Sequence, residues 1–400
     1  MQKKVDVIVI GAGVVGLSIA KSLLSSRKWI SVLVLEKESG LGFHASGRNS
    51  GVIHAGFYYS PDSLKARFCR EGNRDIKELC RLNNIPLKEV GKVVVTSTSE
   101  DERRLEDLYK RGLENGIQLE LLDSKMLPRY EPLAKTKERF IWSPTTAVSD
   151  PRLFIELLAN DVIRLGGKLK FNELIQVDPN NLHVTTSSGE YVAQHIVNAA
   201  GGQADRIAKL FNYSLGLTMI PFMGVYRNTS SAVLPLKTLV YPVPNPINPF
   251  LGVHLTLSVH GLVKIGPTAI PMLNREQYSL AQKWNLRDML ESLRGAYSIV
   301  KGNSHDFPKL VRSEFPKLFE SKLVAEASRL VPSVNTVPEW SRYKPGIRSQ
   351  LVEIKSGQLI TDFVVEGDAK STHVLNVVSP GWTAAIPFGK YVSDRVLTYF

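Results

Sequence analysis

Three glycines near the start of the chain have the spacing of a phosphate-binding turn. Gly11, Gly13 and Gly16 form the pattern G-x-G-x-x-G, and Glu36 follows 20 residues after the last of them. In such a motif the first glycine permits a tight turn, the second lets the backbone approach a pyrophosphate, and the third lets a helix pack closely on a strand. A carboxylate at the end of the next strand accepts hydrogen bonds from a ribose. The spacing therefore predicts a dinucleotide site.

The segments around these glycines predict the elements that such a site needs. The run "VDVIVI" before them is β-branched and has no helical period, "LSIAKSLLSS" after them can form a helix, and "SVLVLEK" reads as a second buried strand. A β-turn-α-β unit at the start of a chain indicates a parallel, doubly wound sheet. Accidental glycine turns are the alternative, but strand, glycines, helix and acid all stand in register.

A second loop rich in glycine and polar residues follows closely, with the sequence "HASGRNSGVIHAGFYY" at 44–59. A nicotinamide coenzyme leaves in every catalytic cycle and does not obviously need a second grip, whereas a resident flavin does. Two later stretches, "NAAGGQAD" and "SPGWTAAIPFGKYV", also place small residues after a strand, where backbone can approach a ligand closely. An ordinary surface turn is the alternative for the loop at 44–59.

Beyond these loops the pattern of the chain changes. Residues 216–275 contain strand-like stretches separated by prolines and glycines, which favours an antiparallel sheet, and residues 276–331 read as helical. We therefore expect an α/β fold with a discontinuous, Rossmann-like nucleotide-binding domain and an α+β substrate domain with an antiparallel sheet. The expected bounds are 1–83, 145–215 and 342–400 for the first domain, and 84–144 and 216–341 for the second.

Composition limits the classes of function. The 400 residues carry a net charge of +12, which suits nucleic acid, an anionic lipid surface or an anionic substrate, but the basic residues are dispersed. We therefore expect no nucleic-acid partner. Cys69 and Cys80 would lie about 16 Å apart along a helix, too far to bridge. The spacing of Cys and His predicts no metal site, and no apolar run is long enough to span a membrane, so we expect a cytoplasmic protein, at most peripheral on the inner face of a membrane.

Several motifs give the chain a specific resemblance. The sequence resembles the FAD enzymes of the D-amino-acid-oxidase-like superfamily, and within it most closely the L-2-hydroxyglutarate dehydrogenase or oxidase family. The segments that carry this resemblance are the glycine motif at 11–16, "SGRNSGVIHAGFYYSPDSLKARFCREG" at 46–72, "IVNAAGGQADRIA" at 196–208, "YPVPNPINPFLGVHLT" at 241–256, "GP" at 266–267, "PGIRSQ" at 345–350 and "SPGWTAAIPFG" at 379–389.

The resemblance implies a noncovalent FAD whose adenosine end lies on the acid at position 36 and whose ring lies at the domain interface. The cofactor contacts that it implies are Gly11, Gly13, Val15, Gly16, Glu36, Lys37, Ser46, Arg48, Asn49, Ser50, Gly51, Val52, Ile53, Val177, Ala200, Gly201, Gly381, Trp382 and Thr383.

The resemblance also implies the residues that act on the substrate. Arg348 stands where the superfamily keeps an arginine that binds a carboxylate, and a guanidinium fork suits that task. His54 and His254 are the candidate bases, because imidazole titrates near neutral pH; a structural histidine is the alternative for each. Further candidates for substrate contact are Tyr58, Tyr241 and Thr383.

The implied reaction is oxidation of an L-2-hydroxy acid, in first place L-2-hydroxyglutarate to 2-oxoglutarate, by hydride transfer to flavin N5, with quinone or oxygen as electron acceptor. Oxidation of glycerol 3-phosphate or of an amino acid is the alternative, and an FAD-containing nucleic-acid-modifying protein is a remote one. One departure motivates the alternative: relatives read P-F-R-G-E-Y where this chain has "PFMGVY", so that Met223 and Val225 replace an arginine and a glutamate. That difference removes an expected cation for a second substrate carboxylate, unless Arg48 replaces it.

Overall fold

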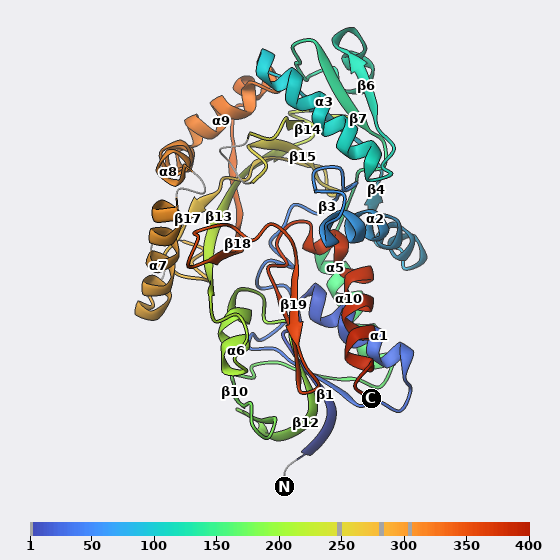
Figure 1. Cartoon of the computed structure of the whole chain (residues 1–400). Coiled ribbons are helices and arrows are strands. Elements are labelled where there is room, and N and C mark those ends of the chain that lie inside the picture. The colour runs from blue at the N-terminus through green and yellow to red at the C-terminus, as the bar shows by residue number, and fades with distance from the viewer. Residues whose placement is uncertain (1–2, 246–249, 280–283, 303–305) are drawn as a thin grey trace.

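The computed structural model describes residues 3–245, 250–279, 284–302 and 306–400. Figure 1 shows an elongated molecule with the N-terminal strand near one end and strands β6 (Glu120–Asp123) and β7 (Arg139–Ser143) at the other. Two large sheets account for this shape, one of eight strands and one of nine. The proline-rich stretch that contributes to the family resemblance lies partly outside the described residues, at 246–249.

The eight-stranded sheet is built around β1 (Lys3–Ile10), which leads directly into the glycine turn. Its central pairings, on both sides of β1, are parallel. Val7 and Val9 enter one hydrophobic core while Ile8 and Ile10 enter another, because a parallel strand at the centre of such a sheet is buried on both faces. The other strands are β2 (Val32–Leu35), β9 (Lys168–Lys170), β10 (Ile175–Asp178), β11 (His183–Thr186), β12 (Gly189–Asn198), β19 (Val364–Gly367) and β20 (Ser371–Leu375).

Helices cover one face of this sheet. There α1 (Val14–Ser26) packs against both α5 (Pro151–Arg164) and α10 (Gly381–Leu397), and α10 packs in turn on α2 (Leu64–Leu82). The other face carries the β10–β11 hairpin and α6 (Ala204–Leu210). The two cysteines of α2 are buried and unbridged.

The nine-stranded sheet is antiparallel except where β14 pairs with β5. Its longest strands, β13 (Leu217–Ser230) and β18 (Ser341–Glu353), pair along most of their length. The remaining strands are β5 (Lys92–Val95), β6, β7, β14 (Leu239–Pro242), β15 (His254–Leu257), β16 (Leu262–Gly266) and β17 (Ile270–Pro271). The helices of this part are α3 (Ser99–Glu114), α4 (Leu127–Tyr130), α7 (Leu286–Gly302), α8 (Phe307–Glu314) and α9 (Glu320–Ser328).

A small sheet of β3 (Val52–Ile53), β4 (Leu87–Lys88) and β8 (Ala147–Ser149) carries the second glycine-rich loop. The fold class predicted from the sequence is confirmed, since a parallel α/β sheet is joined to a largely antiparallel one. The sequence analysis assigned residues 342–400 to the nucleotide-binding domain. β18 departs from that division, because it pairs with β13 and so belongs to the second sheet. We therefore propose that the last domain boundary follows Glu353 and not residue 342. None of the helices in the described ranges combines the length and the hydropathy needed to cross a bilayer.

Candidate active site

A cavity of about 730 Å³ lies where the two sheets meet, within the range of roughly 300–1,000 Å³ that is usual for ligand sites. Residues from the glycine turn, the second loop, the C-terminal loop and the nine-stranded sheet all line it. The predicted site residues that line it are Gly11, Gly13, Val15, Glu36, Lys37, Ser46, Arg48, Asn49, Ser50, Val52, His54, Ala200, Gly201, Tyr241, His254, Arg348, Gly381, Trp382 and Thr383.

The glycine turn is held by close backbone packing. Gly11 has a φ of +103°, and a Cβ at this position would lie 2.6 Å from the carbonyl oxygen of Ala199. A Cβ on Gly16 would lie 2.0 Å from the carbonyl oxygen of Gly11, so Gly16 packs α1 on the turn and does not itself line the cavity. Gly13 supplies no side-chain cap to the first turn of α1, in which the N–H of Val14 donates to Ser46 Oγ at 3.0 Å. The first turn therefore presents backbone donors and the positive end of a helix dipole at the cavity, as a pyrophosphate site requires.

Glu36 is fixed at the end of β2 by two backbone donors. Its Oε2 accepts from the N–H of Ala12 at 2.9 Å, and its Oε1 accepts from the N–H of Glu38 at 3.0 Å. A carboxylate has about four acceptor sites, so this one retains the capacity to bind a ribose diol. The structure thus joins the acid to the glycine turn, as the sequence spacing predicts.

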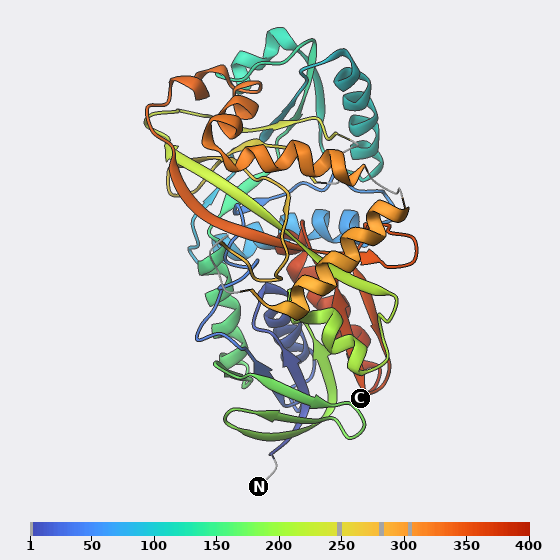
Figure 2. The same cartoon turned by 90° about the vertical axis from the view of Figure 1, so that its left-hand side faces the viewer.

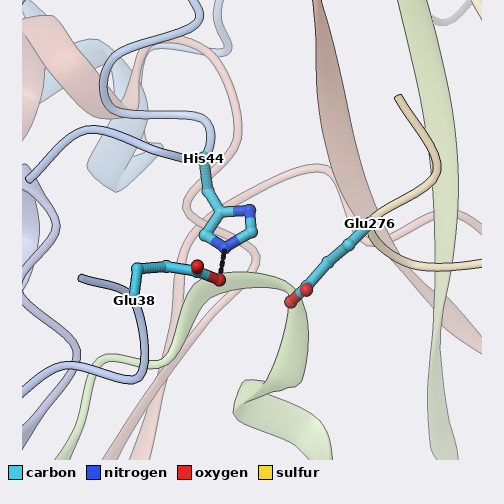
Figure 3. A group of neighbouring side chains, drawn as sticks. All are labelled: Glu38, His44 and Glu276. Carbon is cyan, nitrogen blue, oxygen red and sulfur yellow. Dashed lines mark hydrogen bonds and ion pairs between the residues drawn. The ribbon is translucent and has the colours of Figure 1, made fainter. Parts of the chain in front are cut away.

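Lys37 lies within a cluster of two acids and an imidazole. Figure 3 shows Glu38, His44 and Glu276 converging, with Glu38 Oε1 at 2.8 Å from His44 Nε2. The three residues have a geometry that a metal ion could use, but the ammonium of Lys37 lies among them, 2.9 Å from His44 Nε2 and 3.0 Å from Glu276 Oε2. Burial opposes its charge, but the bonds to Glu38 and Glu276 outweigh burial and raise the pKa of Lys37. The cluster is therefore an ion-pair network that joins the two domains.

Arg48 is bound to backbone and to an aromatic ring. Its Nε donates to the carbonyl of Phe43 at 2.6 Å, its Nη1 donates to the carbonyl of Pro345 at 3.3 Å, and its guanidinium lies 4.1 Å from the ring centre of Tyr278. These contacts connect the second loop to β18 and to the segment around Tyr278. They point to a role in closing the cavity wall.

His254 is held in one tautomer. Its Nδ1 lies 2.7 Å from the carbonyl oxygen of Gly252, and because a carbonyl can only accept, Nδ1 carries the proton and Nε2 keeps the lone pair. Burial, together with the charges of Arg348 and Lys92, outweighs the Gly252 hydrogen bond and lowers the pKa of His254 to about 3. The free imidazole is therefore neutral and can accept a proton at Nε2.

His54 is attached to the C-terminal loop. Its backbone N–H donates to Thr383 Oγ1 at 3.1 Å, and that hydroxyl in turn donates to the carbonyl of Val52 at 3.3 Å. The Nδ1 atom of His54 is buried and has no hydrogen-bond partner. Burial, assisted by the charge of Lys92, holds the pKa of His54 well below its usual value. Thr383 thus positions the second loop, whether or not it also contacts substrate.

Arg348 is half-buried and has no anion bonded to it among the described residues. It lies on β18 opposite Phe222, its Nη1 is buried without a hydrogen-bond partner among those residues, and its guanidinium lies 5.2 Å from the ring centre of Phe250. The cavity-lining cations Lys37, Arg206 and Arg275 each pair with carboxylates of the chain. A buried donor left without an acceptor is costly, so the arrangement fits an anionic ligand at Arg348.

Lys92 is a residue that the sequence analysis missed. It is fully buried on β5, and its Nζ has no hydrogen-bond partner in the part of the chain that the structure describes. The Nζ atom lies over the rings of Phe57, Tyr58 and Tyr241, 4.4, 4.5 and 4.7 Å from their centres. Burial lowers the pKa of Lys92 to about 7. The only signal in the sequence is a lysine that opens the apolar run "KVVV". Tyr58, predicted to contact substrate, does not line the cavity, because its ring belongs to this cage.

Besides Gly16, three further predicted cofactor contacts lie outside the cavity lining. Gly51 has a φ of +80°, and a Cβ there would meet the carbonyl of Ser149 at 2.5 Å, so it permits the pairing of β3 with β8. Ile53 is fully buried in the helix-covered core of the first sheet. Val177 packs in the core on the opposite face of that sheet. The cavity is lined instead by residues 173–175, which lead into β10 and include its first residue.

Met223 and Val225 do not line the cavity, although their neighbours Gly224 and Tyr226 do. Met223 is 3% exposed and packs in a small apolar cluster with Ile270 and Met272, next to Val225. The departure from "PFRGEY" therefore falls on the side of β13 that faces away from the cavity. The expectation that it removes a cation from the substrate site stays a prediction, since Met223 and Val225 themselves contribute nothing to the cavity lining.

Comparison with known proteins agrees with this site. The family model for DAO, FAD dependent oxidoreductase, matches residues 6–395. L-2-hydroxyglutarate dehydrogenase of Escherichia coli (strain K12) is 33% identical over 406 residues, which cover 98% of this chain and 93% of that protein. L-2-hydroxyglutarate dehydrogenase of Indibacter alkaliphilus is 33% identical over 402 residues, with 99% of each chain covered. The mitochondrial enzyme of that name from Caenorhabditis elegans is 32% identical over 414 residues, covering 99% and 94%.

Solved structures support the fold. L-alpha-glycerophosphate oxidase from Mycoplasma pneumoniae with FAD bound has a TM-score of 0.73 at 21% identity, with 99% of this chain and 95% of that chain covered. Glycine oxidase from Geobacillus kaustophilus has the same TM-score at 19% identity and the same coverage. The N-terminus of α1, the acid at the end of β2 and the buried indole N–H of Trp382, which has no partner among the described residues, provide donors and acceptors in the cavity that fit FAD. The chain belongs to the DAO family of FAD-dependent oxidoreductases and, within it, to the L-2-hydroxyglutarate dehydrogenases.

Proposed function

We propose that this protein uses FAD to oxidise L-2-hydroxyglutarate to 2-oxoglutarate. The relatives named L-2-hydroxyglutarate dehydrogenase span nearly the whole chain. The observation that carries the proposal is the guanidinium of Arg348, whose buried Nη1 lacks a hydrogen-bond partner among the described residues and which lies in the same cavity as the neutral imidazole of His254 and the glycine turn. An acid with a hydroxyl beside its carboxylate needs both of these groups.

The residues of the cavity divide the work as follows. Arg348 binds the carboxylate next to the hydroxyl through its fork of donors. His254 Nε2 accepts the hydroxyl proton, because Gly252 fixes the tautomer. When bound, FAD supplies the acceptor for the hydride that leaves the carbinol carbon. The buried Tyr241 ring stacks on His254 and excludes water from one face of the imidazole. His54 is the second candidate base.

Substrate binding also adjusts the base. Burial lowers the pKa of His254 most, and the charge of Arg348 lowers it further in the free protein. A bound carboxylate compensates that charge and so raises the pKa of His254 when the proton must be taken up. Proton acceptance is thereby coupled to occupation of the site.

Electron acceptor and location are further parts of the proposal. We propose a quinone or oxygen as acceptor, and a cytoplasmic protein that associates peripherally with a membrane. The net charge of +12 supports attraction to an anionic lipid surface. Glycerol 3-phosphate or an amino acid as substrate loses its motivating observation, because Met223 faces away from the cavity.

Anaerobic bleaching of the bound flavin tests the substrate. L-2-hydroxyglutarate, its D-enantiomer, glycerol 3-phosphate and a set of amino acids are each mixed with oxidised holoprotein, and the loss of visible flavin absorbance is followed. We expect L-2-hydroxyglutarate alone to bleach the flavin rapidly. Bleaching by another member of the panel, with none by L-2-hydroxyglutarate, would show that the substrate assignment is wrong.

A further inference from the structure

α7 carries a row of exposed apolar side chains along its outer face. They recur at intervals of three and four residues, which places them on one stripe of a helix. The members, with their exposed fractions, are Leu286 (66%), Leu290 (58%), Leu293 (48%), Tyr297 (66%) and Val300 (50%). The opposite face is buried on β13, where a Cβ on Gly295 would meet Ile220. Figure 2 shows α7 in front of the strands on which it packs, with no other element in front of it.

A row of basic side chains runs beside the apolar row. Arg287, Arg294 and Lys301 recur every seven residues, which is about two helical turns, and all three are exposed. The acids of the helix are used internally: Asp288 is buried against Arg206, and Glu291 pairs with Arg206 and Arg275. Glu291 also contacts Arg287 at 3.1 Å. The helix therefore presents apolar groups and cations outward, and no exposed acid among its residues 286–302.

An exposed aromatic side chain precedes the apolar row in the sequence. Trp284 is 60% exposed, two residues before the helix begins. Tryptophan and tyrosine favour the boundary between lipid headgroups and acyl chains, because one part of the ring is apolar and another forms hydrogen bonds. Trp284 and Tyr297 thus flank the leucines with side chains suited to that boundary.

We propose that the outer face of α7, formed by the apolar row, the basic row and Trp284, docks this protein on an anionic phospholipid bilayer. A helix that lies in the plane of a membrane surface combines an apolar stripe with lysines and arginines in this way. The inference rests on the proposed function in one respect: docking would bring the flavin site close to a quinone in the bilayer.

The charge distribution favours a lipid surface over a second copy of the chain. In a two-fold interface this face would meet itself, so the three cations of one helix would lie near the three of the other without an exposed acid from either α7. An anionic headgroup layer instead complements the basic row and leaves the leucines to enter the acyl region. The bonds of Asp288 and Glu291 to Arg206 and Arg275, which line the cavity, tie the docking helix to the active site.

Vesicle sedimentation of the holoprotein tests the proposal. Vesicles of phosphatidylcholine with 30% phosphatidylglycerol and vesicles of pure phosphatidylcholine are compared at low salt. We expect binding to the anionic vesicles, a fall of at least tenfold in their partition coefficient for Leu290→Gln with Tyr297→Gln, and a similar fall for Arg287→Gln with Arg294→Gln and Lys301→Gln. The matched control is Leu82→Gln with Leu215→Gln, which changes exposed leucines elsewhere, 71% and 64% exposed, and should bind as the unmodified protein does.

Two readings would overturn the proposal. One is equal vesicle binding, or none, for the unmodified protein and both α7 variants. The other is a homodimer in sedimentation velocity that the Leu290→Gln, Tyr297→Gln variant dissociates, because the face would then be a contact between copies. Flavin bleaching by L-2-hydroxyglutarate is measured on every variant in solution and should not change. Loss of bleaching in the unmodified protein would count against the proposed substrate while leaving the vesicle result valid.

Discussion

The imidazole of His254 lies face to face with the ring of Tyr241, with centres 3.8 Å apart and planes 20° apart. Gly252 holds the same imidazole at Nδ1. Ring stacking and a backbone acceptor together fix the position and the tautomer of the group that we expect to take the substrate proton. The stack also connects the cavity to the cage around Lys92, because Tyr241 contributes to both.

His254→Asn separates proton acceptance from local structure. The amide nitrogen of asparagine can donate to Gly252 O as Nδ1 does, but the variant has no base at the position of Nε2. We expect flavin reduction by L-2-hydroxyglutarate to slow by about 100- to 10,000-fold, measured by anaerobic stopped-flow absorbance. His260→Asn is the matched control, because that side chain is 58% exposed and paired with Asp150, and its rate should not change.

The same measurement on His54→Ala decides between the two candidate bases. Both imidazoles line the cavity and both are neutral in the free protein, for the same reason of burial. We expect the smaller effect at His54, because its Nδ1 has no hydrogen-bond partner among the described residues and so lacks the bond that fixes the tautomer of His254. If His54→Ala abolishes flavin reduction at neutral pH while His254→Asn leaves it unchanged, the roles are reversed.

Arg348→Lys keeps the charge and removes the fork. A single ammonium cannot form two parallel bonds to a carboxylate, and a charge-assisted hydrogen bond contributes about 1.5–3 kcal/mol. We therefore expect the substrate concentration for half-maximal flavin reduction to rise about 10- to 100-fold, with the flavin spectrum unchanged. Arg342→Lys, on the exposed part of the same strand, should leave that concentration as it is. If both variants raised that concentration by a similar factor, Arg348 would stabilise strand β18 and would not bind the substrate carboxylate.

Lys92→Met tests the buried cation through its effect on stability. In the folded protein burial lowers the pKa of Lys92 to about 7, from an ordinary value of 10.5. Between these values the unfolded chain binds a proton that the folded protein does not, so this lysine makes stability increase as pH rises from 7 toward 10. Below pH 7 Lys92 is charged in the folded protein as well, so the free energy of unfolding is reduced by the full cost of burying that charge.

The variant should therefore gain most at low pH. Methionine fills similar space without a charge, and replacing buried ionic groups by apolar ones typically adds up to about 1–4 kcal/mol. We expect urea unfolding to show the variant as more stable at pH 6 and the advantage to shrink as pH rises to 9. If the difference in the free energy of unfolding between the two proteins stayed constant from pH 6 to pH 9, the pKa of Lys92 would not be lowered by burial in the cage.

The sequence could predict which segments meet at the nucleotide end of the cavity, because its signals there are local. The glycine turn, the strand before it and the acid at position 36 lie within one β-turn-α-β unit, and their spacing alone defines their geometry. The substrate end is assembled from distant segments. The cage of Lys92 needs Phe57, Tyr58 and Tyr241 to meet, and no periodicity in the sequence records that meeting. Likewise β18 joins the second sheet through pairing with a strand more than 100 residues away.

Met223→Arg tests whether the departure at "PFMGVY" concerns the substrate. Met223 packs against Ile270 and Met272, outside the cavity lining, and arginine there would be a buried charge without a partner. We expect a loss of roughly 3–5 kcal/mol in urea unfolding and no decrease in the concentration of L-2-hydroxyglutarate needed for flavin reduction. Met223→Leu, which conserves volume, should cost less than about 1.5 kcal/mol. A stable Met223→Arg variant that bound L-2-hydroxyglutarate tenfold more tightly would instead show that a cation at this position reaches the substrate.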